Sequence, residues 1–223
     1  MKVGRKLANK ILNVTKFVLG IGDVDPEPTA TEPIDQSMLA KLDGVIAEAT
    51  SAFEAFDYAR ALERTESFFW WFCDDYVEFV KGRAYGSQGV VPAASARAAL
   101  RSALDVLLRL FAPILPFATE EAWRWWRDAS IHVQPWPSST ASAGDPALLD
   151  LPLEVLGLVR RTKTEAKVSQ RAQVASLRVT VPGSAIQALD AGRADLLEAG
   201  SIQQIDVVEG EAVRCDVQLA PST

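Results

Sequence analysis

Histidine and cysteine are scarce in this chain of 223 residues, which has one histidine, His132, and two cysteines, Cys73 and Cys215. A single histidine excludes metal sites built on two histidines and leaves no second histidine for a nucleophilic triad. Since a lone histidine is most often a surface or structural residue, we assign His132 no function. The cysteines are far apart and form no CxxC pair, which argues against a zinc ribbon and favours a reducing, cytoplasmic setting.

Long apolar runs and the common catalytic motifs are also missing. No apolar run reaches the roughly eighteen residues that a membrane helix needs, and the N-terminus does not resemble a secretory signal. The phosphate loop GxxxxGK[ST], the GxGxxG turn and the GxSxG elbow are absent. The acid pairs Asp74/Asp75 and Glu120/Glu121 are adjacent, so on a helix their side chains point about 100° apart, a poor geometry for shared chemistry. The sequence does not indicate a self-contained enzyme.

Charge is unevenly distributed along a chain whose net charge is -6. Residues 1–20 hold five Lys or Arg and no acid, and residues 159–178 hold six against Glu165. Two basic segments on an acidic body predict a localised site for an anionic partner, although either segment alone could be a solvated helix face.

The N-terminal segment has the period of an amphipathic helix over residues 3–19. Apolar residues recur every three or four positions, and a basic and amide face follows on the opposite side. The apolar side consists of Val3, Leu7, Ile11, Val14 and Val18, and the polar side of Lys2, Lys6, Asn9, Lys10, Asn13 and Lys16.

Further helices are expected along the first two thirds of the chain, giving a mainly α, antiparallel helix bundle over residues 1–134. Phe68, Phe72, Tyr76 and Phe79 fall on one stripe, which is typical of core. The expected helices are 35–53, 57–83 with Asp57 as N-cap, 92–111 opened by Pro92, and 119–128 with Thr119 as N-cap.

A segment rich in Pro, Ser, Ala and Gly over residues 135–149 predicts a linker. Beyond it, residues 150–223 read as a small α+β module. We expect a helix over 150–169, a strand over 174–181 and a helical stretch over 184–199 broken at Gly192. Two further strands on either side of Glu209-Gly210-Glu211 give a hairpin signal.

Four blocks together resemble a known family: GRKLANKILNVTKFVL, FFWWFCDDYVEFVKGRAY, LDVLLRLFAPILPFATEEAWRWW and SIHVQPWP. In this order and spacing they are similar to the region after the catalytic domain of class I aminoacyl-tRNA synthetases for bulky aliphatic amino acids. The nearest likeness is to valyl-tRNA synthetases of a bacterial, actinobacterial type. It covers residues 1–137, and the tail resembles the small module that follows in some of them.

This resemblance implies an anticodon-binding bundle that grips the anticodon stem-loop of valine tRNA. The first expected contacts are Arg5, Asn9, Lys10, Asn13 and Lys16, followed by Lys81 and Arg83, and then by Arg160, Arg161, Lys163 and Lys167. For Lys81 and Arg83, stabilisation of the helix dipole is an equally good interpretation. Trp125, Trp126 and Trp136 are possible stacking surfaces, although core packing is the better interpretation for most of them.

The resemblance also predicts what this chain does not contain. The ATP-binding signatures of class I synthetases are absent, so we expect a fragment of a longer enzyme that uses ATP and Mg, with no catalytic residue, metal or cofactor in this chain. Its partners would be valine tRNA and the catalytic domain of that enzyme. Two alternatives stay open: a module that docks on a protein through its basic helices, and the same region of an isoleucyl- or leucyl-tRNA synthetase.

Overall fold

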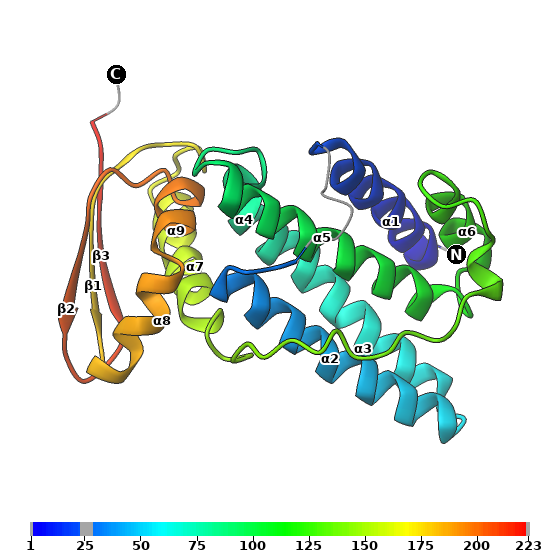
Figure 1. Ribbon diagram of the computed structural model, residues 1–223. Helices are drawn as coiled ribbons and strands as arrows, with labels where there is room; N and C mark the ends of the chain where they lie inside the picture. The colour runs from blue at the N-terminus through cyan, green and yellow to red at the C-terminus, as the bar shows by residue number, and fades with distance from the viewer. Residues whose placement is uncertain (1, 23–28, 222–223) are drawn as a thin grey trace.

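The first two thirds of the chain form an antiparallel helix bundle, as the sequence predicts (Figure 1). The computed structural model describes residues 2–22 and 29–221. In these ranges no helix is both long and apolar enough to cross a membrane. The elements of the bundle are α1 (Lys2–Gly20), α2 (Pro33–Glu54), α3 (Tyr58–Trp71), the π-helical turn η1 (Phe72–Tyr76), α4 (Val77–Ala84), α5 (Val90–Phe111), α6 (Pro116–Arg124) and the 3₁₀ turn η2 (Ile131–Val133).

The apolar stripe of α1 is buried. Leu7, Ile11, Val14 and Val18 are almost inaccessible to solvent, and α1 packs on α5 and α6. The side chain of Val3, the first residue of the predicted stripe, lies outside the description. Burial of this stripe fixes the rotation of α1 about its own axis, so that the polar side of the helix faces solvent.

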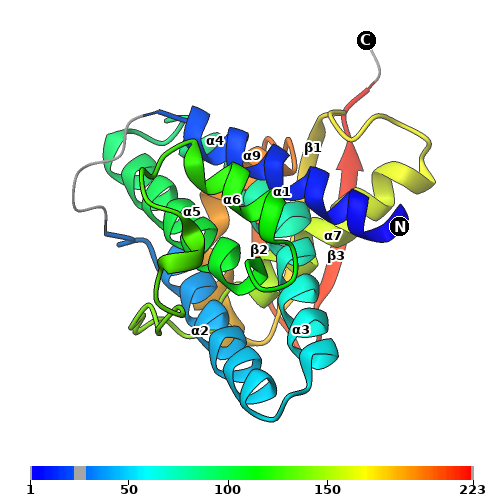
Figure 2. The same cartoon turned by 90° about the vertical axis from the view of Figure 1, so that its right-hand side faces the viewer.

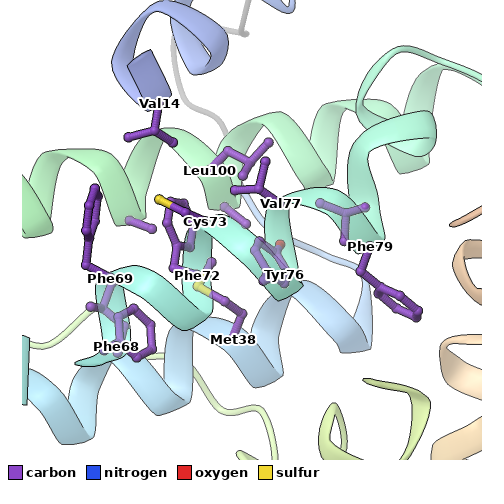
Figure 3. Packing of buried hydrophobic residues seen from close by; sticks show 14 of the residues in the cluster. Val14, Met38, Phe68, Phe69, Phe72, Cys73, Tyr76, Val77, Phe79 and Leu100 are labelled. Atoms are coloured by element: carbon purple, nitrogen blue, oxygen red, sulfur yellow. The ribbon is translucent and has the colours of Figure 1, made fainter. Parts of the chain in front are cut away.

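The aromatic stripe of the third predicted helix forms the centre of the core. Phe68, Phe72, Tyr76 and Phe79 are buried, and Figure 3 shows Val14 of α1 close to Cys73 on this segment. Asp57 is the N-cap as predicted, since its carboxylate accepts a hydrogen bond from the Arg60 amide. The sequence did not reveal that the helix widens into a π-helical turn at Phe72–Tyr76, so the single predicted helix is α3, η1 and α4.

Two predicted helix starts are wrong. Helix α5 begins at Val90 after Gly89, whose φ of 96° favours glycine, so Pro92 lies within its first turn rather than at its start. Helix α6 begins at Pro116, and Thr119 is buried inside it with its hydroxyl donating to the Leu115 carbonyl. Pro116 explains the earlier start, because the fixed φ of proline suits the first turn of a helix.

Residues 135–149 lie as an extended strap along α2 (Figure 1). Ser139 and Thr140 donate to the carboxylate of Asp43, and the Ser142 hydroxyl donates to the Gln36 carbonyl. A Cβ atom on Gly144 would lie 2.4 Å from the Gln36 backbone, so only glycine lets the strap approach so closely. Its hydrogen bonds tie this segment to the bundle along its length.

The C-terminal part consists of helices and a three-stranded sheet, with α7, α8 and α9 between the sheet and the bundle (Figure 1). Its elements are α7 (Asp150–Glu165), β1 (Val174–Val181), the 3₁₀ turn η3 (Gly183–Ala185), α8 (Ile186–Ala191), α9 (Arg193–Ala199), β2 (Ile205–Glu209) and β3 (Arg214–Leu219). The predicted break at Gly192 separates α8 from α9.

The predicted hairpin between the last two strands is wrong, because β2 and β3 do not pair with each other. The strand order is β2-β1-β3, with β2 parallel and β3 antiparallel to β1. Strand β1 is the most buried of the three and takes the centre. The crossover through α8 and α9 brings β2 parallel to one edge of β1, and residues 210–213 carry the chain to the other edge.

Candidate nucleic-acid interface

The solvent-facing side of α1 carries cations and amides in helical register. Arg5, Lys6, Asn9, Asn13 and Lys16 are exposed, and we call these five residues the α1 surface. Among the described residues, no carboxylate forms an ion pair with the three cations of this set. The α1 surface therefore presents positive charge and amide groups together, a combination that suits contacts with phosphates and base edges.

Lys10 lies at one flank of the α1 surface and already has a partner. Its ammonium is 2.7 Å from an Asp74 carboxylate oxygen and 5.8 Å from the centre of the Trp70 ring. Partial burial disfavours the charged form, but the bond to Asp74 and the nearby negative charges outweigh it and raise the pKa of Lys10. A phosphate would have to compete with Asp74 for this cation.

Lys16 lies at the other flank, over the exposed aromatic ring of Trp125, the residue that follows α6. Its ammonium is 5.5 Å from the centre of the Trp125 ring, which is 37% exposed. The Trp125 indole nitrogen donates to Glu121 and so fixes the ring against its own helix. At such a place the cation can contact a phosphate, and the neighbouring aromatic ring can stack on a base.

A second cation and aromatic group lies at the C-terminal end of α1. Tyr85, which is 61% exposed, meets the edge of Phe17 with ring centres 6.1 Å apart. The Lys81 ammonium is 5.6 Å from the centre of the Phe17 ring and also pairs with Glu78 at 3.0 Å. Lys81 is therefore next to α1, as an RNA contact would require, although its charge is partly compensated.

Arg83 is not at the surface, and the prediction that it contacts RNA is wrong. It is 3% exposed, and its guanidinium donates to both carboxylate oxygens of Asp35 and to both of Asp195. Burial would lower the pKa of Arg83, but the two carboxylates raise it. The hydroxyls of Tyr76 and Ser95 complete the network on Asp35. Arg83 thus joins α2 and α4 to α9.

The second predicted basic group divides between surface and core. Arg161 and Lys167 are exposed and Arg160 is half-buried, whereas Lys163 is 1% exposed. The Lys163 ammonium donates to the carbonyls of Gln170 and Gly200, at 3.0 and 2.8 Å. Burial and the neighbouring charge of Arg160 lower its pKa. The prediction that Lys163 contacts RNA is therefore wrong.

The contacts implied by the family resemblance do not include Lys6, Trp70 or Tyr85. The helical period of residues 3–19 does place Lys6 on the polar side of the helix. Trp70 and Asp74 are four residues apart and lie on the side of their helix opposite the buried stripe, but nothing local shows that Lys10 contacts them. Of the three tryptophans considered as stacking surfaces, Trp125 and Trp136 are exposed and Trp126 is half-buried. In the described ranges no cluster of three or more His, Cys, Asp or Glu residues could hold a metal ion.

Comparison with known proteins assigns the chain to a family. The family described as anticodon-binding domain of tRNA ligase matches residues 35–180. Valine–tRNA ligase of Thermobifida fusca is 51% identical over all of this chain, and that of Cutibacterium acnes is 48% identical over 94% of it. The enzyme of Salinispora arenicola is 45% identical over 99% of the chain. The chain spans only 26%, 25% and 28% of the lengths of these relatives. The chain therefore belongs to the family of anticodon-binding domains of tRNA ligases, as the counterpart of the anticodon-binding region of valine–tRNA ligases.

Proposed function

We propose that the chain binds the anticodon stem-loop of valine tRNA through the α1 surface. Bound in this way, the tRNA would be positioned for aminoacylation by catalytic domains that are not part of this chain and that would use ATP and Mg. The observation that carries the proposal is the exposed row of Arg5, Asn9, Asn13 and Lys16, with the accessible Trp125 ring beside Lys16. Cations supply affinity for phosphates, while amides and the aromatic face can distinguish unstacked bases.

The specificity for valine tRNA rests on the named relatives and on the sequence resemblance. Isoleucine and leucine tRNAs remain the alternatives, since the contacts of α1 do not themselves select an amino acid. The docking of the chain on a protein is less well supported. An exposed apolar stripe on α1 would favour such docking, but Leu7, Ile11, Val14 and Val18 are buried.

Binding measurements on the full chain test this proposal. Valine tRNA and a noncognate tRNA are titrated over a salt series, with Lys16→Glu as the variant and Arg64→Glu as a control charge reversal on α3. Arg64 has an exposed ion pair with Glu48, a kind of pair that contributes little to stability. We expect Lys16→Glu to weaken the binding of valine tRNA by about tenfold or more and to reduce the salt slope by about one. Arg64→Glu should leave both unchanged.

Two results would contradict the proposal. Valine tRNA and noncognate tRNA could bind equally well at every salt concentration, which would remove the specificity. Alternatively, Lys16→Glu and Arg64→Glu could have equal effects, which would mean that net charge rather than the α1 surface governs binding.

A further inference from the structure

A second exposed basic group lies where α7 ends. It consists of Arg160, Arg161, Lys167 and Arg171, which we call the α7 basic end. Arg160 is half-buried and the other three are exposed, and among the described residues none of the four pairs with a carboxylate. Its side chains include no aromatic ring, and residues 159–173 contain none. The α7 basic end therefore differs from the α1 surface, where Lys16 lies over the Trp125 ring.

Hydrogen bonds hold the α7 basic end in one shape. Lys167 has a φ of 56°, which turns the chain back after the helix. The buried Lys163 ammonium binds the Gln170 carbonyl, and the Gln170 amide donates to the Arg160 carbonyl and the Thr164 hydroxyl. Because the same ammonium also donates to the Gly200 carbonyl, Lys163 attaches Gln170 to the C-terminal end of α9. The buried lysine keeps the exposed cations of the loop and of the helix together.

The π-helical turn η1 connects this group to the α1 surface. Asp74 binds Lys10 of α1. Burial raises the pKa of the next residue, Asp75, and the positive charge of Arg160 partly offsets this effect. In Figure 2 helix α1 runs across the molecule, and its N-terminal end lies on the right-hand side, where the chain that follows α7 also lies. The buried bonds of Arg83 to Asp35 and Asp195 fix the part of the chain that carries α7 against the bundle. One rigid ligand could contact both groups at once.

We propose that the α7 basic end is a second RNA site, which binds the phosphate backbone of a double-helical stem next to the loop held by α1. This inference rests on the proposed function. The α7 basic end lacks the aromatic ring and the row of asparagines that accompany the cations of α1, so it has few groups that could distinguish one base from another. Its cations suit the regularly spaced phosphates of an A-form helix. Because Asp74 and Asp75 separate the two groups, the RNA backbone would be contacted at two places rather than along a continuous track.

The test compares two RNAs and two double variants of the full chain. The RNAs are the anticodon stem-loop of valine tRNA and a single strand with the same loop sequence and no stem. The variant is Arg160→Glu/Arg161→Glu. The control is Arg178→Glu/Arg214→Glu, which makes the same charge change on exposed residues of the sheet in the same part of the chain. It also removes the exposed ion pair of Arg178 with Asp206, a kind of pair that contributes little to stability.

We expect the Arg160→Glu/Arg161→Glu variant to bind the stem-loop about tenfold more weakly or worse, and to lose about 1.5 from its salt slope, as for two phosphate contacts. The variant should bind the single strand as the wild type does. It should no longer protect the stem of the stem-loop from ribonuclease. The Arg178→Glu/Arg214→Glu control should change none of these. Equal unfolding temperatures for wild type, variant and control would exclude a folding defect.

Three results would overturn the inference. The variant could bind the stem-loop like the control, or the two variants could weaken it equally, or the variant could lose the stem-loop and the single strand to the same degree. The failure of the proposed function would look different, because Lys16→Glu would then leave RNA binding unchanged or the wild type would show no salt-sensitive binding at all.

Discussion

Glu120 shows how one side chain can stabilise a turn in this protein. Its carboxylate accepts hydrogen bonds from Arg124, from the Ser130 hydroxyl and from the Ile131 amide. These contacts, with that to Arg124 the strongest, lower the pKa of Glu120 from 4.5 to about 2. Because the folded state holds the ionised form, this stabilisation is present in full above pH 4.5 and is lost as the pH falls through about 2.

We therefore predict a pH-dependent effect of Glu120→Gln, which keeps an acceptor but removes the charge. The free energy of unfolding of the variant should be lower than that of the wild type at pH 7. The difference should shrink between pH 4.5 and about 2. Urea unfolding at several pH values measures this. A difference that stays constant over that range would mean that the charge of Glu120 is not involved.

At the same scale, the sequence could identify cations but not their surroundings. Arg83 and Lys163 each lie four residues after a buried apolar residue, Phe79 and Val159, so helical period places both on the buried side of their helices although their charge favours the surface. Their partners are Asp35 and Asp195 for Arg83, and the carbonyls of Gln170 and Gly200 for Lys163. Several of these partners are far away in the sequence, and no local pattern shows that they converge. Lys16 was predicted correctly as an exposed residue because the period of α1 alone decides which of its residues face solvent.

At the scale of the element, the two sides of α1 should have separate roles, one in stability and one in RNA binding. Ile11→Ala removes buried methyl groups and should lower the free energy of unfolding by about 2–5 kcal/mol. Asn13→Ala, on the exposed side, should change it by less than about 0.5 kcal/mol but weaken RNA binding. Chemical denaturation and RNA titration of both variants measure these effects. The separation fails if Asn13→Ala destabilises the protein as much as Ile11→Ala does.

Elements with a strong local signal were predictable, and their arrangement was not. Alternation alone gave β1, and the aromatic stripe gave the long helix that begins after Asp57. The hairpin prediction failed because the Glu209-Gly210-Glu211 signal describes a turn, whereas strand pairing depends on which strand is buried. Strands β2 and β3 both pair with β1, because β1 is the strand whose side chains, among them Val174, Leu177 and Val179, belong to the core. The π-helical turn at Phe72–Tyr76 leaves no comparable mark in the sequence.

For the whole molecule, the buried network of Arg83 makes the bundle and the C-terminal part interdependent. The sequence predicts separate units over 1–134 and 150–223 with a linker between them. In the structure, buried side chains of α2, α4 and α9 share one charge network, and the strap over 135–149 follows α2. Removing one member of such a network leaves a buried charge without its partner, which typically costs about 3–5 kcal/mol.

We predict that the chain unfolds in one transition and that Arg83→Met destabilises it more than Asp195→Asn does. Without Arg83, the carboxylates of Asp35 and Asp195 both lose their partner, whereas without the Asp195 charge the pair of Arg83 and Asp35 remains neutral. All six tryptophans precede residue 150, so their fluorescence reports on the bundle, while hydrogen exchange of the β1 amides reports on the sheet. Coinciding denaturation midpoints for both signals, shifted together in each variant, would establish one cooperative unit. Two separate midpoints in the wild type would instead mean that residues 150–223 fold independently and that the distance between the α1 surface and the α7 basic end is not fixed by Arg83.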